Sequence, residues 1–431
     1  MFEKLNLLIP IGNFIRNKSI QNFLFLAIIQ SSNILISIIS VPLLIQSIGL
    51  DQFGLVNLGL SVMVLVNVLI VFGYNLSAPK EIAIYRDDKL ILSQIISKIL
   101  FAKILLGSIS ILLILLAILI FNAFSDYKVI VIFSTLIIVS EVFNVVWFFQ
   151  GMEKMKLVSI ANIFSKLLFL MGIVLFISSP EQSHWVNFLM GLFGAIINLS
   201  LIVYIHSVLG VKFIYPGVLI IWGSIKENIL LFLSSLSSYL STNFGLVILS
   251  FFEGPDSLGM YSLAEKVVLV LRLFPALIIQ AIYPNASRLF KNDQNHFFRF
   301  LKRVYLKVLL LGAFISIGTY FSANMIIEVL SRTGNLDESV NYLRILSPMP
   351  FLACLNIGNI TLLLVADLKE LLFRASWIMC LYTLIICTYL TGLMGGVGLC
   401  IGIISTEIVV FIICLFLLYR HKKDLLYGFY L

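Results

Sequence analysis

The sequence repeats part of itself 205 residues later, without a gap. The matched positions are Gly49 and Gly254, Asp51 and Asp256, Gly54 and Gly259, Pro79 and Pro284, Asp88 and Asp293, and Gly107 and Gly312. Leucine and isoleucine matches carry little weight in so apolar a chain. Glycine and proline have backbone requirements of their own. The repeat therefore predicts two copies of one structural unit.

The composition excludes a water-soluble globule. Hydrophobic residues make up 61% of the chain and charged residues 12%, whereas soluble domains have roughly 45–50% and 25%. The net charge of +8 does not indicate nucleic-acid binding, because the basic residues lie in short gaps between apolar runs. We therefore predict an all-α polytopic membrane protein.

Apolar runs of about 20 residues, the length that spans a membrane, predict twelve transmembrane helices. They lie near residues 20–46, 54–84, 94–121, 128–149, 157–178, 185–206, 227–251, 259–285, 303–321, 341–365, 374–391 and 397–419. Because each repeat holds an even number, we expect two six-helix bundles related by a pseudo-twofold axis along the membrane normal. The predicted bundles are 1–206 and 226–431, joined by a cytoplasmic connection at 207–225.

The charges of the loops predict the orientation. Twenty Lys and Arg residues lie at the two termini and in the even-numbered connections, whereas the opposite loops hold two, Lys128 and Arg332. The positive-inside rule then places both termini in the cytoplasm. Residues 1–18 lack a short apolar core with a cleavage site, so we expect no cleavable signal peptide.

Cofactor chemistry is not expected. The five cysteines lie in apolar stretches without a C-x-x-C pair, which predicts reduced packing residues and no metal site. The four histidines lie at span ends or in loops with no nucleophile at a suitable spacing. No G-x-x-x-x-G-K-[ST] loop occurs, so ATP does not power the protein directly. We expect no cofactor and no enzymatic activity.

Arg272 lies near the middle of the predicted eighth span, where a charge costs at least ~2.5–3.5 kcal/mol. Glu265 precedes it by seven residues, on almost the same helix face. One interpretation is a cationic lining that binds phosphate or an acidic sugar through the planar guanidinium. The alternative is an ion pair of Arg272 with Glu265 or another buried carboxylate.

Amide side chains occupy related positions of the predicted spans. Asn67 matches Arg272 in the repeat and Asn75 matches Gln280, while Gln30 and Asn33 lie on the first span. We predict that these residues, with Arg272, Glu265 and Lys266, line a substrate cavity. The alternative for the first span is helix packing through small and polar residues.

Three further charged residues lie deep in predicted spans: Glu141, Lys166 and Glu407. Glu141 and Lys166 lie on neighbouring spans, so we favour a structural ion pair between them. The alternative is that Glu141 and Glu407 are protonatable carboxylates that couple ion flow to transport.

Several short motifs, taken together and in order, resemble the polysaccharide flippases of the Wzx O-antigen family. They are Ile48-Gly49-x-x-x-Phe53-Gly54, Phe72-Gly73, Ala78-Pro79, Gln150-Gly151 and Gly254-x-x-x-x-Gly259-x-Tyr261. The resemblance extends over nearly the whole chain. That family belongs to the same superfamily as the multidrug MATE exporters and the lipid II flippases.

The resemblance implies alternating-access movement of an undecaprenyl-diphosphate-linked oligosaccharide across the bacterial inner membrane, for lipopolysaccharide biosynthesis. Arg272 and Lys266 match the cations of the family's cavity. The implied partners are the lipid-linked oligosaccharide, membrane lipids, and the polysaccharide polymerase with its chain-length machinery, and no nucleic acid.

Two other functions remain open. A MATE-type drug or cation antiporter requires an acidic cavity, which Arg272 opposes, and the first span has no carboxylate resembling an ion-coupling residue. A membrane enzyme such as an O-antigen polymerase requires a large external loop or a convergent catalytic set. The sequence shows neither.

Overall fold

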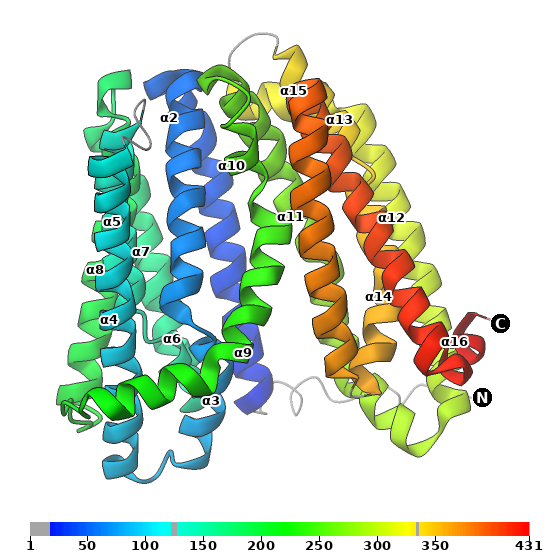
Figure 1. Cartoon of the computed structure of the whole chain (residues 1–431), viewed down its shortest axis with the longest axis horizontal. Coiled ribbons are helices and arrows are strands. Elements are labelled where there is room, and N and C mark those ends of the chain that lie inside the picture. The colour runs from blue at the N-terminus through cyan, green and yellow to red at the C-terminus, as the bar shows by residue number, and fades with distance from the viewer. Residues whose placement is uncertain (1–17, 122–126, 333–335, 367, 431) are drawn as a thin grey trace, which may run out of the picture. The chain divides into compact units, whose positions relative to one another are not determined.

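The computed structural model describes residues 18–121, 127–332, 336–366 and 368–430, and in these ranges every regular element is a helix (Figure 1). Nine segments of the described chain are long and apolar enough to cross a membrane. The all-α polytopic fold is therefore confirmed. The count of twelve spans in two bundles about a twofold axis stays a prediction.

The first of two compact units contains most of the chain up to Leu236. Helix α2 (Lys18–Val71) contributes its described part up to Ile48 and its part from Val62 onward. The other elements are α3 (Tyr74–Ile84), α4 (Lys89–Phe121), α5 (Lys128–Val142), α6 (Val146–Gly151), α7 (Met155–Phe176), the short 3-10 helix η1 (Pro180–Gln182), α8 (His184–Ser207) and the beginning of α9 (Val218–Asn243).

The second unit contains Gly49–Ser61 and the described chain from Ser237 onward. Its helices, after the end of α9, are α10 (Gly245–Leu249), α11 (Pro255–Asn292), α12 (Gln294–Ser331), α13 (Asp337–Leu346), α14 (Met349–Val365), α15 (Lys369–His421) and α16 (Lys423–Tyr430). We call Gly49–Ser61 the tip of α2, and the parts of α2 before and after it the two arms. The tip thus belongs to a different unit from the two arms. The boundaries 1–206, 207–225 and 226–431, which follow the sequence repeat, stay a prediction.

Two of the long helices, α2 and α15, are each two helices joined at a glycine. Gly49 has φ +81° and Gly395 has φ +57°, values that side chains with a Cβ rarely adopt. The two parts of α15 pack together, because the Tyr382 hydroxyl lies 3.2 Å from the Ser405 hydroxyl. The sequence prediction of separate spans on either side of each glycine agrees with this geometry.

The equivalent glycines Gly54 and Gly259 lie against each other in the second unit. A Cβ at Gly54 would lie 2.5 Å from the backbone nitrogen of Gly259 and from the carbonyl oxygen of Pro255. A Cβ at Gly259 would overlap the carbonyl oxygen of Leu50. Only glycine permits this backbone contact, so the contact accounts for one of the repeated pairs.

Other repeated residues also have a structural reason. Asp88 precedes α4, and its Oδ1 accepts hydrogen bonds from the backbone of Leu90 and Ile91 at 2.9 and 3.1 Å. Asp293 precedes α12 and accepts from the backbone of His296 at 2.9 Å, which holds the pKa of Asp293 below its ordinary value. Both aspartates therefore cap a helix N-terminus.

The two halves differ in their second helix. In the first half the helix breaks at Phe72 and Gly73, where the backbone has φ +42° and +79°, and it restarts as α3. The break lets α9 approach closely, and Phe72 stacks on Phe232 with ring centroids 4.3 Å apart. The equivalent helix of the second half, α11, runs unbroken from Pro255 to Asn292.

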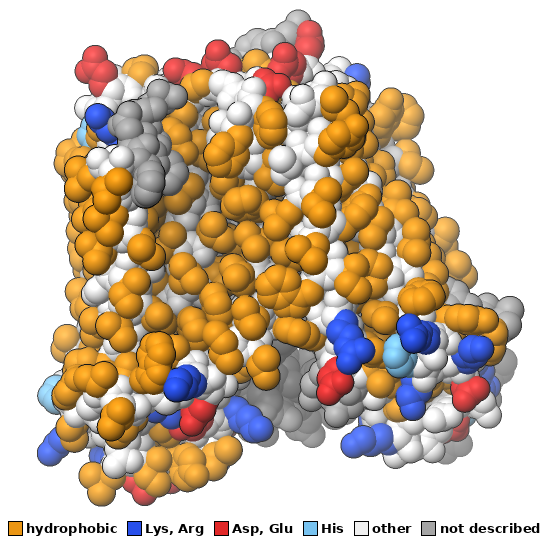
Figure 2. Space-filling model, viewed as in Figure 1, with side chains coloured by type: hydrophobic (Ala, Val, Ile, Leu, Met, Phe, Trp, Pro, Cys, Tyr) orange, Lys and Arg blue, Asp and Glu red, His pale blue; other side chains and the backbone are white. Residues whose placement is uncertain are grey.

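The surface of each unit carries a broad band of hydrophobic side chains, with Lys and Arg gathered at one end (Figure 2). Leu119 and Leu230 are examples of exposed hydrophobic residues, and Arg86 and Arg288 are also exposed. Such a band matches the hydrocarbon of a bilayer.

The glycine contact generates a stability prediction. We expect Gly54→Ala to lower the stability of the protein by roughly 1–3 kcal/mol, because the added methyl group displaces backbone rather than a flexible side chain. The measurement is the melting temperature of the detergent-purified protein. Gly318→Ala is the control, since no atom lies within 4 Å of a Cβ there. Equal melting temperatures for the two variants would contradict close packing at Gly54.

Candidate functional site

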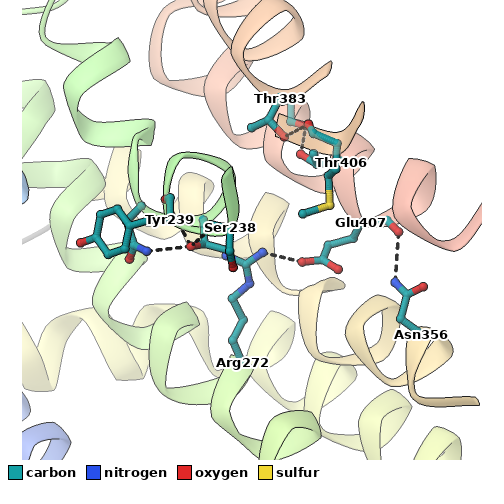
Figure 3. A network of polar contacts seen from close by, with 11 residues as sticks. Ser238, Tyr239, Arg272, Asn356, Thr383, Thr406 and Glu407 are labelled. Atoms are coloured by element: carbon teal, nitrogen blue, oxygen red, sulfur yellow. Dashed lines mark hydrogen bonds and ion pairs between the residues drawn. The ribbon is translucent and has the colours of Figure 1, made fainter. Parts of the chain in front are cut away.

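Arg272 of α11 forms an ion pair with Glu407 of α15 (Figure 3). The side chains are 20% and 15% exposed, respectively. The two residues are separated by 135 positions in the chain. Each charge supplies the other with a counter-charge, and removing either partner would leave a buried charge uncompensated. The sequence offered two interpretations of Arg272, a ligand-binding residue or one half of an ion pair. The structure shows an ion pair, and the partner of Arg272 is Glu407 rather than Glu265.

Polar groups from other helices of the second unit surround the pair. The amide nitrogen of Asn356, on α14, donates to the backbone carbonyl of Glu407 at 3.3 Å. Ser238 and Tyr239 of α9 lie beside Arg272 on the side away from Glu407 (Figure 3). We call Arg272, Glu407, Asn356, Ser238 and Tyr239 the arginine cluster.

The neighbouring charges of α11 have different surroundings. Glu265 accepts a hydrogen bond from the hydroxyl of the buried Tyr261 at 3.4 Å. Lys266 is half-buried and has no ion pair within the described part of the chain. The predicted role of both residues in binding a substrate stays a prediction.

The predicted residues of the first half do not all come together. Asn33 and Asn67 line a cavity of about 260 Å³ in the first unit, and Glu141 lines the same cavity. Gln30 and Asn75 are exposed and do not line it. The side chain of Gln280 lies outside the described residues.

The expected ion pair of Glu141 with Lys166 is wrong. Glu141 instead lies 3.6 Å from the Nζ of Lys103 on α4, and its carboxylate accepts from the amide of Asn144 at 3.1 Å. The reason is a break between α5 and α6. It frees the Asn144 carbonyl, which accepts a hydrogen bond from Lys103 at 3.0 Å. Lys103 is therefore held between a carbonyl and a carboxylate.

Sequence reasoning missed several polar residues that the structure brings together. Asn356 joins the arginine cluster, while Asn162 and Asn198 line the cavity of the first unit. Each is a polar residue in a largely apolar run, so each carries the same signal as Asn33 and Asn67. Lys166, which the sequence already marked as a deep charge, lines the same cavity. Lys103 carried the clearest signal, since it lies deep in a predicted span and is 1% exposed.

The fold is similar to solved structures of polytopic membrane transporters. The lipid II flippase MurJ, in an inward closed conformation, matches with a TM-score of 0.73 and 15% identity, covering 94% of this chain and 90% of that one. An inward-facing multidrug resistance MATE family transporter of the MOP superfamily matches with a TM-score of 0.70 and 12% identity, covering 94% and 99%. The chain therefore has the fold of this class of transporters.

The chain belongs to the family described as "Polysaccharide biosynthesis protein", which matches residues 19–290. Two similar proteins share the description "Putative O-antigen transporter". The one from Escherichia coli (strain K12) is 26% identical over 394 residues, covering 90% of this chain and 94% of its own. The one from Shigella dysenteriae is 25% identical over 397 residues, covering 90% and 97%.

The arginine cluster generates a prediction for double-variant stability. We expect Arg272→Met and Glu407→Gln each to destabilise the protein by about 3–5 kcal/mol, because each leaves a buried group without its partner. The double variant should be more stable than either single variant. The measurement is thermal unfolding of the four purified proteins in one detergent. If the losses of stability of the two single variants simply add up in the double variant, Arg272 and Glu407 do not stabilise each other.

Proposed function

We propose that this protein is a flippase that moves undecaprenyl-diphosphate-linked O-antigen repeat units across the inner membrane by alternating access. The observation that carries the proposal is family membership. Two relatives described as "Putative O-antigen transporter" also match this chain over nearly their whole length. The likeness to MurJ and to a MATE transporter supplies the fold that such a movement requires.

The arginine cluster is the proposed anchor for the diphosphate. A guanidinium meets phosphate oxygens with two parallel hydrogen bonds, the geometry that also holds carboxylates. A diphosphate carries more negative charge than the single carboxylate of Glu407, so it competes with that carboxylate for Arg272. Binding of the lipid-linked sugar then displaces Glu407 from its partner.

Displacement gives Glu407 a second role in this proposal. A carboxylate that loses its cation inside the membrane is costly, and protonation removes the cost. We therefore propose Glu407 as a candidate for coupling ion flow to the transport cycle.

A drug or cation antiporter of the MATE type is the second proposed function, because the fold is shared. The charges of α11 and α15 weigh against it. Glu265 and Glu407 are matched in number by Lys266 and Arg272, so these four residues carry no net negative charge to hold a cationic drug. The similar proteins are named as transporters or flippases, which weighs against a polymerase or another enzyme.

The location follows from the same proposal. The nine apolar segments found in the described part of the chain make this a multi-pass membrane protein. We propose the bacterial inner membrane with both termini in the cytoplasm. The polymerase and its chain-length machinery would receive the flipped repeat units on the other side.

Deletion of the protein in its native strain tests the proposed activity. We expect lipid-linked repeat units to accumulate on the cytoplasmic side and surface polysaccharide to be lost, because the polymerase acts only after the flip. The measurement is the accessibility of the lipid-linked sugar to a membrane-impermeant probe. Normal surface polysaccharide in a strain that holds no second flippase would refute the proposal.

Substitutions of Arg272 test how the diphosphate is held. We expect Arg272→Lys to reduce complementation of the deletion at least tenfold, since lysine lacks the planar fork. Arg288→Lys is the matched control, because Arg288 is an exposed residue on the same helix. Export is compared at equal amounts of membrane-inserted protein. Full activity of Arg272→Lys would show that the site requires only a positive charge and that bidentate recognition is not needed.

A further inference from the structure

A groove of about 360 Å³ lies on the second unit, between α12 and the junction of α13 with α14. Residues of α12 from Ala313 to Tyr320 form one wall, and Ser347, Pro348 and Phe351 form the other. Pro348 has no backbone N–H to continue the helix, and α13 ends just before it. The groove therefore follows a break in the helical ladder.

The hydroxyl groups of the two serines in the wall already have partners. The hydroxyl of Ser347 donates to the carbonyl of Arg344 at 2.8 Å. The hydroxyl of Ser316 accepts a hydrogen bond from the backbone of Phe351 at 3.1 Å. The wall that remains is formed mainly by apolar groups such as Ala313 and Ile317. Such a surface favours a hydrocarbon group over water.

The groove lies on a face of α12 that carries large exposed hydrophobic side chains. Phe314, Ile317 and Phe321 are 74%, 59% and 77% exposed, and their spacing puts them on one helix face. Because α12 is long and apolar enough to cross a membrane, this face contacts lipid chains. The molecules that reach the groove are therefore lipids of the bilayer.

Arg344 lies at one end of the groove. Its guanidinium carbon is 5.8 Å from the centre of the Tyr320 ring, and its Nη2 donates to Oδ1 of Asn324 at 3.4 Å. Asn324 lies beyond Tyr320 toward the end of α12 at Ser331, and Arg344 lies between the start of α13 at Asp337 and the groove. The guanidinium therefore lies on the side of the groove where both helices approach the membrane surface.

The charge of Arg344 has no carboxylate partner within the described part of the chain. Its Nε is buried without a hydrogen-bond partner, so contact with a ligand falls to the terminal nitrogens, Nη1 and Nη2. Arg344 is half-buried and lies about 10 Å along α13 from Asp337. From that depth an arginine side chain reaches the layer of lipid headgroups.

We propose that this groove binds one anionic phospholipid, with an acyl chain along α12 and the phosphate at Arg344. The groove follows α12 from Ala313 to Tyr320, about 10 Å, so it holds part of a single chain. Phosphate oxygens accept hydrogen bonds from the guanidinium and supply the missing counter-charge. An anionic headgroup is preferred, because a zwitterionic one brings its own cation. In the orientation predicted from the loop charges, this lipid belongs to the outer leaflet.

Native mass spectrometry of the delipidated full-length protein in detergent tests the site. The protein is titrated separately with phosphatidylglycerol, phosphatidylethanolamine and undecaprenyl phosphate, and the dissociation constant of the first bound lipid is measured. We expect phosphatidylglycerol to bind most tightly. Arg344→Met should weaken its binding about tenfold, because hydrogen bonds to a charged group are lost, whereas Arg344→Lys should retain part of it. Arg288→Met, at an exposed arginine of α11, is the control.

A second variant tests the chain rather than the headgroup. Ala313→Leu adds a side chain inside the groove and removes no charge, so we expect it to weaken the binding of phosphatidylglycerol severalfold. Gly318→Leu is the matched control on the same helix, since Gly318 is exposed and no atom lies within 4 Å of a Cβ there. All variants are compared as monodisperse protein with unchanged helix content.

The proposal is overturned if the folded protein retains no phosphatidylglycerol, or if either Arg344→Met or Ala313→Leu binds it as the matched control does. Tighter binding of undecaprenyl phosphate would also overturn it, because the groove would then hold a polyprenyl carrier. A dimer that binds no lipid would show that a second copy covers the groove. Because binding is measured without transport, the result is independent of the flippase proposal.

Discussion

Within the hydrocarbon of a membrane, charged groups and free backbone groups find their partners only inside the protein. This constraint explains the main polar contacts of both units. Lys103 lies between the carbonyl of Asn144 and the carboxylate of Glu141, and the carbonyl is available because the helix breaks there. Arg272 and Glu407 satisfy each other from different helices of the second unit. In each case the cation and the carboxylate come from different helices, so the ion pair also helps to hold the helices together.

The two halves differ in how far their buried charges have partners. In the second unit Glu265 and Glu407 are matched in number by Lys266 and Arg272, and Arg272 has a carboxylate partner. In the first unit, Asn67 occupies the position equivalent to Arg272, and it lines a cavity where Lys166 has no partner among the described residues. The repeat thus preserves the packing framework while the buried charges have diverged. We place the proposed anchor for the diphosphate in the second half.

Much of the fold could be predicted from the sequence because it depends on local properties. Apolar runs give the spans, and the repeated Gly54, Gly259, Asp88 and Asp293 mark close backbone contact and helix caps. The polar sites were harder to predict. That Arg272 needs a partner follows from its depth, but the choice of Glu407 over Glu265 depends on which faces of α11 and α15 meet. The partner of Glu141 was predicted wrongly because the break after Val142 has no glycine or proline to mark it.

The tip of α2 has a consequence for how the chain is made. Gly54 packs against Gly259 and Pro255, residues that the ribosome adds about 200 positions later. At bacterial synthesis rates of 5–20 residues per second, this is a delay of roughly ten to forty seconds. During that time the first helical hairpin is already made, yet its tip exposes a glycine surface with no partner. The contact at the tip of α2 is therefore incomplete until the eighth span is synthesised.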